Sequence, residues 1–184
     1  VSALVGFVSA VDNDTRRHAL NCVCNAAKNA ANRRILMDLK VEKAVAARLW
    51  SDDAKQPLNP KVASSAIEAA ISLSAGESNA GELGAQGAIE RLLTLISWDD
   101  ARCQVTAAEA LVALTAQSSD NKTLFVESDG PAKLAALFSS DDHAKHAAAA
   151  GIVKNIASSP KTKSCLTEIS VVPGLIKCTC EGST

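Results

Sequence analysis

The clearest periodic pattern of apolar and polar residues lies mid-chain, between Asn79 and Thr115. Residues 88–96 and 101–115 carry apolar side chains at helical spacing, which predicts two helices preceded by a shorter one. Gly87 separates the first helix from the second, because glycine readily adopts the left-handed conformation that ends a helix. Asp99 and Asp100 supply side-chain oxygens that cap the third helix. The stretch therefore predicts one three-helix unit with its own start and stop signals.

The same pattern recurs on both sides of this unit. Asn121 follows Asn79 by 42 residues, and LAALFSSDDHAKHAAAAGIVKNIA then stands in the place of LLTLISWDDARCQVTAAEALVALT. Upstream, Asn32 precedes Asn79 by 47 residues, with the excess in a loop. Short helices repeated in register predict a stacked array. The predicted units are a partial repeat 1–30, repeats at 31–77, 78–118 and 119–159, and a partial repeat 160–184.

These units resemble the armadillo repeat in their residue pattern. The pattern reads N-x-x-x-apolar-x-x-x-Gly, then Gly-Ala-Ile-x-x-Leu-x-x-Leu, then Ala-x-x-Ala-Leu-x-Asn-Leu-Ala, and it matches best at 79–115, Cys22 to Ala27 and Ile152 to Ala157. The resemblance implies an all-α fold over residues 1–184, a right-handed superhelical solenoid of armadillo repeats. HEAT-like repeats are the alternative, and the short first helices ending at Gly87 and Gly130 favour armadillo.

Several features depart from regularity at particular positions. Lys40 stands where the pattern expects glycine, and residues 147–151 are all small, which predicts an unusually close neighbouring helix. Residues 51–60 form a lengthened turn containing two prolines, interpreted either as a partner contact or as a tolerated insertion. Residues 160–170 predict another first helix. Because the chain starts and ends inside a repeat, we expect it to be a segment of a longer array.

Composition limits the classes of partner and compartment. The chain is 47% apolar, has 19 basic and 20 acidic residues, and carries a net charge of -1, so it lacks the basic excess typical of nucleic-acid binding. Its longest uncharged run, residues 1–11, is about half of what a membrane-spanning helix needs. The six cysteines stand mostly at helical positions, which predicts buried thiols in a reducing compartment. We expect a cytoplasmic protein, with the nucleus as the alternative.

Candidate chemistry is sparse in this sequence. It contains no P-loop, nucleophile elbow, H-E-x-x-H or dinucleotide-binding glycine pattern. His143 and His146 are spaced as a helical pair but stand beside acidic residues at a helix start, where we expect both to face water. Cys178 and Cys180 form a pair without a second pair at metal-ligand spacing. We therefore predict no catalytic residue, no metal site and no cofactor, and a metal- or thiol-dependent enzyme is the least favoured alternative.

The armadillo resemblance implies a binding groove lined by the third helices, with a ladder of Asn side chains that hold an extended peptide. The ladder positions are Asn25, Ser72, Ala113 and Asn155 here. The position one turn earlier, Trp in nuclear import adaptors, is Asn21, Glu68, Glu109 and Gly151, so binding of nuclear localisation signals in that manner is not expected. The predicted groove residues are His18, Asn21, Asn25, Lys28, Ser65, Glu68, Ser72, Thr106, Glu109, Ala113 and Asn155.

We therefore interpret the chain as a non-enzymatic scaffold or adaptor that binds another protein or an extended peptide along this groove. Glu68 and Glu109 would favour basic residues in that partner. A more particular alternative comes from Ser128 to Ile169, which is similar to the armadillo region of UCS-type myosin chaperones. That similarity implies a myosin motor as the partner. Neither interpretation involves nucleic acid or membrane insertion.

Overall fold

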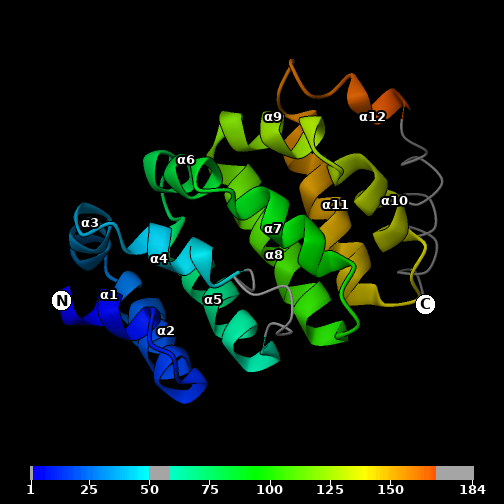
Figure 1. Cartoon of the computed structure of the whole chain (residues 1–184). Helices are drawn as coiled ribbons and strands as arrows, with labels where there is room; N and C mark the ends of the chain where they lie inside the picture. Colours follow the sequence, from blue (N-terminus) through cyan, green and yellow to red (C-terminus); the bar gives the residue numbers. More distant parts are fainter. Residues whose placement is uncertain (1, 50–58, 169–184) are drawn as a thin grey trace.

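A computed structural model of the chain describes residues 2–49 and 59–168, and Figure 1 shows its helices in order. These two stretches contain helices and turns and no β-strand. The helices are α1 (Ser2–Val8), α2 (Asn13–Ala27), α3 (Ala30–Asp38), α4 (Val41–Ala47), α5 (Pro60–Leu73), α6 (Glu77–Ala85), α7 (Ala88–Ile96), α8 (Ala101–Gln117), α9 (Ser119–Glu127), α10 (Gly130–Phe138), α11 (His143–Ala157) and α12 (Cys165–Glu168). None of them is long and apolar enough to cross a membrane.

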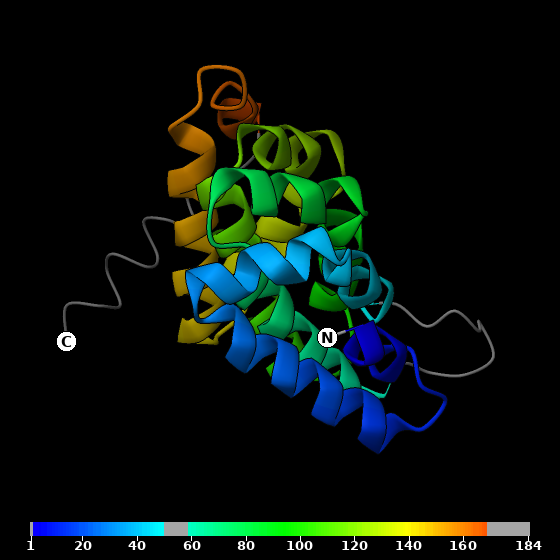
Figure 2. The ribbon, with the colours of Figure 1, turned by 90° about the vertical axis from the view of Figure 1, so that its left-hand side faces the viewer.

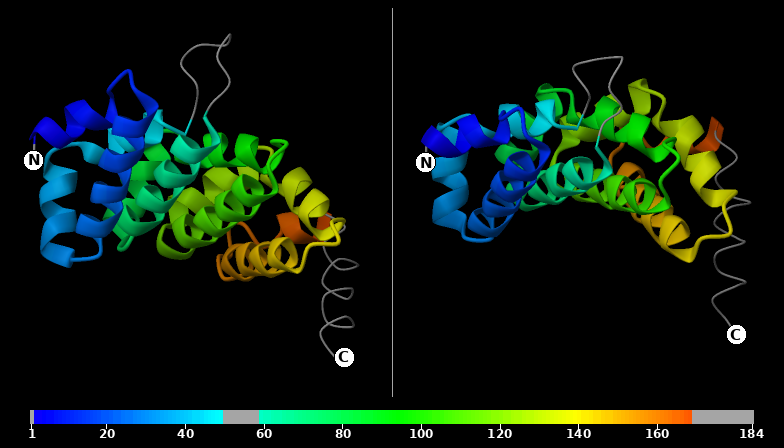
Figure 3. Two further views of the ribbon diagram at one scale, coloured as in Figure 1. Left: turned by 90° about the horizontal axis from the view of Figure 1, so that it is seen from below. Right: turned by 60° about the horizontal axis from the view of Figure 1, so that its bottom comes forward.

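The long helices α2, α5, α8 and α11 lie side by side and form one layer of the molecule. Each packs against the next, and the shorter helices cover the other side of the layer. Figure 3 shows that the array is curved, with the four long helices on the inside of the curve. Figure 2 shows the same stack from the end that α1 to α4 form. The architecture is therefore a curved helical solenoid.

The core runs continuously through the stack and consists mainly of small and branched aliphatic residues, with Phe125 and Phe138 among them. Ile67, Leu111 and Ile152, one from each of three neighbouring long helices, are fully buried. The close packing predicted for residues 147–151 is confirmed at Gly151, where an added Cβ would lie 3.1 Å from the Val112 side chain of α8. Small residues thus let α11 approach α8 closely.

Aspartate side chains cap the starts of three long helices, and the cap predicted at Asp100 is confirmed. The Asp12 carboxylate accepts a hydrogen bond from the Thr15 amide at 2.7 Å, and Asp100 accepts from the Cys103 amide at 2.8 Å. Asp142 accepts from the Ala144 amide, also at 2.8 Å. These bonds satisfy amides that have no partner inside the helix.

The connections between first and second helices differ from repeat to repeat. Gly87 has a left-handed backbone, with φ of 79°, and Lys40 adopts the same conformation with φ of 58°. Gly130 does not have positive φ and is instead the first residue of α10. A Cβ there would lie 2.3 Å from the Phe125 carbonyl oxygen, so close approach and not backbone conformation requires this glycine.

The first helix predicted over residues 160–170 is only partly correct. Residues 160–164 form a turn, and α12 begins at Cys165. Residue 169 and the rest of the C-terminal stretch, including Cys178 and Cys180, lie outside the described residues, as does most of the predicted 51–60 loop.

Candidate functional site

The inner face of the curve is built by α2, α5, α8 and α11, which supply all but one of the predicted groove residues. The exception is Lys28, which caps the carboxyl end of α2. Exposed side chains are His18, Asn25, Lys28 and Glu109; half-buried ones are Asn21, Glu68, Ser72, Thr106, Ala113 and Asn155. Ser65 is buried, with 7% of its surface exposed, and so offers little to a partner.

The seam between α2 and α5 carries a polar contact near the carboxyl ends of the two helices. The Cys24 thiol and the Ser72 hydroxyl lie 3.3 Å apart and share a hydrogen bond across the seam. On α2, the Lys28 ammonium donates to the Asn25 side-chain oxygen at 2.9 Å. Because Asn25 and its hydrogen-bond partner Lys28 are both exposed, the Asn25 side chain is open to a bound chain.

The seam between α5 and α8 carries an ion pair and a further carboxylate. Glu68 and Arg102 form an ion pair with 3.9 Å between Oε1 and Nη2, and their side chains are 46% and 81% exposed. Such an exposed pair is worth at most about 1 kcal/mol, so Arg102 is easily displaced. Glu109 lies exposed on the same helix as Arg102. Arg102 is not among the predicted groove residues, although its position seven residues before Glu109 places both on one face of the helix.

Asn155, at the last ladder position, joins α11 to α8 through hydrogen bonds. The Asn155 amide group donates to the Val112 carbonyl at 2.9 Å and to the Thr115 hydroxyl at 3.1 Å. Its donors are therefore used within the fold. The two ladder asparagines consequently differ: Asn25 is exposed, and Asn155 ties two helices together.

The histidine pair does not behave as the sequence suggested. His143 is exposed, but His146 is buried, and its Nε2 lies 2.6 Å from the Ser140 carbonyl oxygen. The prediction that both rings face water is thus wrong for His146, because this hydrogen bond draws the ring inward. Across residues 2–49 and 59–168, no three His, Cys, Asp or Glu side chains gather in an arrangement that could hold a metal ion.

The described cysteines lie in different environments. Cys103 is buried, and burial raises the pKa of its thiol to about 11, with the nearby Asp100 acting in the same direction. Cys24 and Cys165 are half-buried. Cys22 is exposed, so the prediction of buried thiols is wrong for that residue.

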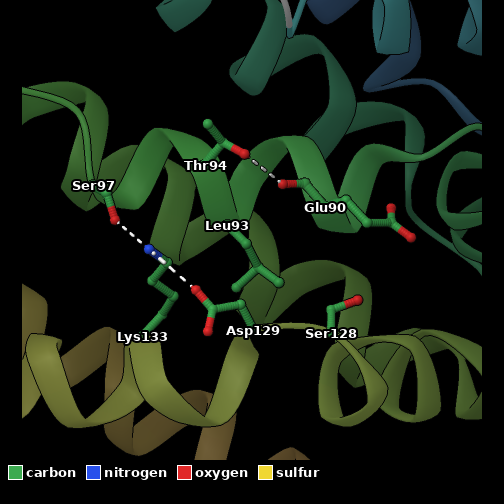
Figure 4. A pocket seen from close by; sticks show the side chains of 7 residues that line it. All are labelled: Glu90, Leu93, Thr94, Ser97, Ser128, Asp129 and Lys133. Carbon is green, nitrogen blue, oxygen red and sulfur yellow. Dashed lines mark hydrogen bonds and ion pairs between the residues drawn. The ribbon is translucent and has the colours of Figure 1, made fainter.

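A pocket of 270 Å³ lies on the outer side of the array, between α7 and the start of α10. Figure 4 shows the Lys133 ammonium there between the Ser97 hydroxyl, 2.6 Å away, and the Asp129 carboxylate, 3.3 Å away. Arg91 stands 42 residues earlier and donates to the Ala46 carbonyl of α4. Both cations therefore reach back to the second helix of the preceding repeat.

Comparison with known proteins shows which solved structures share this architecture. No protein-family profile and no curated protein sequence matches the chain. Solved structures do match: computationally designed armadillo repeat proteins for modular peptide recognition have a TM-score of 0.83 at 21% identity, covering 96% of this chain and 73% of theirs. A designed armadillo repeat protein in complex with the peptide (KR)4 has a TM-score of 0.85 at 21% identity, covering 96% and 72%. The crystal structure of an engineered protein has a TM-score of 0.85 at 23% identity, again covering 96% of this chain and 72% of its own. The chain has the fold of an armadillo-repeat solenoid.

Proposed function

We propose that the chain is a protein-binding scaffold whose inner face takes an extended, basic segment of another protein. The observation that carries this is the pair of carboxylates, Glu68 and Glu109, presented by neighbouring helices in the middle of the curve. Glu109 is exposed, and only a weak ion pair partly neutralises Glu68. A lysine or arginine of a bound chain can replace Arg102 at Glu68 and pair with Glu109 at little cost.

Exposed Asn25 extends this surface toward α2. An asparagine side chain offers both a donor and an acceptor, so it can satisfy the backbone groups of an extended peptide without selecting its sequence. We assign backbone recognition to Asn25 and charge selection to Glu68 and Glu109. One designed protein of the same fold was solved with the peptide (KR)4, which makes a basic peptide the natural first probe.

Fluorescence anisotropy with a labelled (KR)4 peptide tests this proposal. We expect the double variant Glu68→Lys with Glu109→Lys to weaken binding at least about tenfold, because two attractive pairs become repulsive. The matched control is Glu90→Lys with Glu127→Lys, which changes the net charge equally on the outer helices α7 and α9. Equal loss of peptide affinity in both double variants, or no loss of affinity in either, would contradict a specific role for the inner face.

The similarity of residues 128–169 to UCS-type chaperones makes a myosin motor the second candidate partner. In this case the scaffold would hold an unfolded segment of the motor along the same face. Co-sedimentation with a motor domain distinguishes the two, because a general peptide scaffold has no reason to retain that client. Absence of the chain from the motor pellet would remove this candidate and leave the peptide experiment unaffected.

A further inference from the structure

Ser97 lies outside the proposed groove, at the end of α7, where its side chain is exposed. Its hydroxyl oxygen accepts a hydrogen bond from the Lys133 ammonium at 2.6 Å, and that ammonium comes from the next repeat. The Lys133 side chain is only 24% exposed, and it also pairs with Asp129. A solvent-accessible hydroxyl is thus held against the cation of a half-buried side chain.

The pocket beside this contact gives a larger group room to sit. Figure 4 shows Leu93 facing the pocket and the Glu90 carboxylate at the end opposite Lys133. The pocket volume of 270 Å³ exceeds that of a phosphoryl group several-fold, so one attached to Ser97 need not displace a packed side chain. Of the charged groups lining the pocket, Lys133 is the cation that such a group would meet first.

The residues after Ser97 carry a second, independent signal. Asp99 and Asp100 follow at the second and third positions, in the non-helical turn before α8. A protein kinase with a basic substrate cleft selects such acidic residues by charge complementarity. We infer that Ser97 is a phosphorylation site for an acidophilic protein kinase, and that Lys133 holds the phosphate and thereby fastens the α6–α8 repeat to the α9–α11 repeat.

The reaction transfers the γ-phosphoryl group of ATP to the Ser97 oxygen. The new bond joins phosphorus to Oγ, the bond from phosphorus to the bridging oxygen of ADP breaks, and the hydroxyl proton goes to the kinase's base. The product carries about -1.5 to -2 charges at neutral pH, so the hydrogen bond from the Lys133 ammonium to a neutral hydroxyl becomes an ion pair between opposite charges. Asp129 and the carboxyl end of α7 oppose the new charge. The decisive measurement is therefore how the pKa of the Ser97 phosphate depends on Lys133.

The test uses the whole 184-residue chain, an acidophilic kinase and ATP, with the phosphate located by mass spectrometry. We expect phosphate on Ser97 and its loss in Ser97→Ala. Ser139 is the internal comparison, since it stands 42 residues later and is followed by Asp141 and Asp142 at the same spacing. Failure to modify Ser97 while a control peptide is phosphorylated would overturn the site.

Phosphorus NMR then tests the role of Lys133. The second pKa of the Ser97 phosphate should be lower by about half a unit in the wild-type chain than in Lys133→Met, because the ammonium favours the dianion. Lys133→Arg should restore the lowered value, and circular dichroism confirms that each variant is folded. Identical phosphate pKa values in all three proteins would overturn the assignment of Lys133 and leave the groove proposal untouched.

Discussion

Asn155 and Val112 join the last two long helices, through a hydrogen bond of 2.9 Å from the Asn155 amide to the Val112 carbonyl. The same amide donates to Thr115, so its donors are used inside the fold. Asn25 occupies the equivalent position on α2, where it is exposed. One residue type therefore has two roles along the inner face, helix tethering at α11 and availability to a partner at α2.

Alanine substitution should separate these two roles. Asn155→Ala removes two interhelical hydrogen bonds and should lower the free energy of unfolding by about 1–3 kcal/mol, measured by urea denaturation. Asn25→Ala should change it by less than about 0.5 kcal/mol, because the residue is exposed. Equal destabilisation by the two substitutions would argue against the tether.

Replacing either of two glycines in α6 by alanine should change the stability of the fold, in opposite directions for the two positions. At Gly84 an added Cβ would lie 1.8 Å from the Asn121 side-chain oxygen, and Asn121 is itself buried and bonded to the Ala80 carbonyl. We expect Gly84→Ala to destabilise the fold by about 1–3 kcal/mol through overpacking. At Gly81 the nearest atom is 3.7 Å away, so Gly81→Ala should stabilise the helix by roughly 0.5–1 kcal/mol.

Thermal and urea denaturation of the two glycine variants compares them directly. A stable Gly84→Ala protein would show that Asn121 moves aside without cost. That result would contradict the tight contact between α6 and α9.

Replacing Lys40 by glycine should stabilise the fold. Its left-handed backbone carries a steric cost that glycine lacks, so Lys40→Gly should raise the free energy of unfolding by roughly 0.5–1 kcal/mol. Lys43 provides the control, because it is exposed inside α4 and glycine there should cost about 1 kcal/mol. Destabilisation of similar size in both variants would contradict the strain at Lys40.

Glu42 should make stability depend on pH. Both carboxylate oxygens are buried and have no hydrogen-bond partner among the residues that the structure describes, and burial raises the pKa of this group above its ordinary value of 4.5. The folded state therefore holds the proton more tightly than the unfolded state. Its stability is greatest below the unfolded pKa and falls as pH rises through the raised folded pKa.

The apolar substitution Glu42→Met tests this dependence. It keeps the side-chain length and removes the buried carboxyl, so the variant should exceed the wild type in stability at pH 8, with a smaller difference at pH 4. Urea denaturation at both pH values gives the comparison. A wild-type advantage at pH 8 would show that the carboxylate has a stabilising partner.

Much of the fold could be predicted from sequence because its helices carry local signals. α7 begins and ends where the pattern of apolar residues predicts, and Asp100 caps the helix that follows it. These signals depend on neighbours within a few residues along the chain. They need no knowledge of the tertiary structure.

The side-chain contacts of the inner face could not be predicted in the same way. Ser65 is buried because α5 packs between α2 and α8, and helical periodicity does not distinguish a second packed face from an exposed one. The Arg102 ion pair and the Asn155 tether join residues 34 and 43 positions apart and depend on which rotamers meet across a seam. Their detection requires the stacked structure.

The most direct test of the account locates a bound basic peptide on the molecule. A (KR)4 peptide with a nitroxide spin label broadens the NMR amide signals of nearby residues in the isotopically labelled chain. We predict selective broadening at Asn25, Glu68 and Glu109 on the inner helices, with Glu90 and Glu127 on the outer helices unaffected. Broadening confined to the outer helices, or spread evenly over both faces, would contradict the proposal that the inner curve is the binding surface.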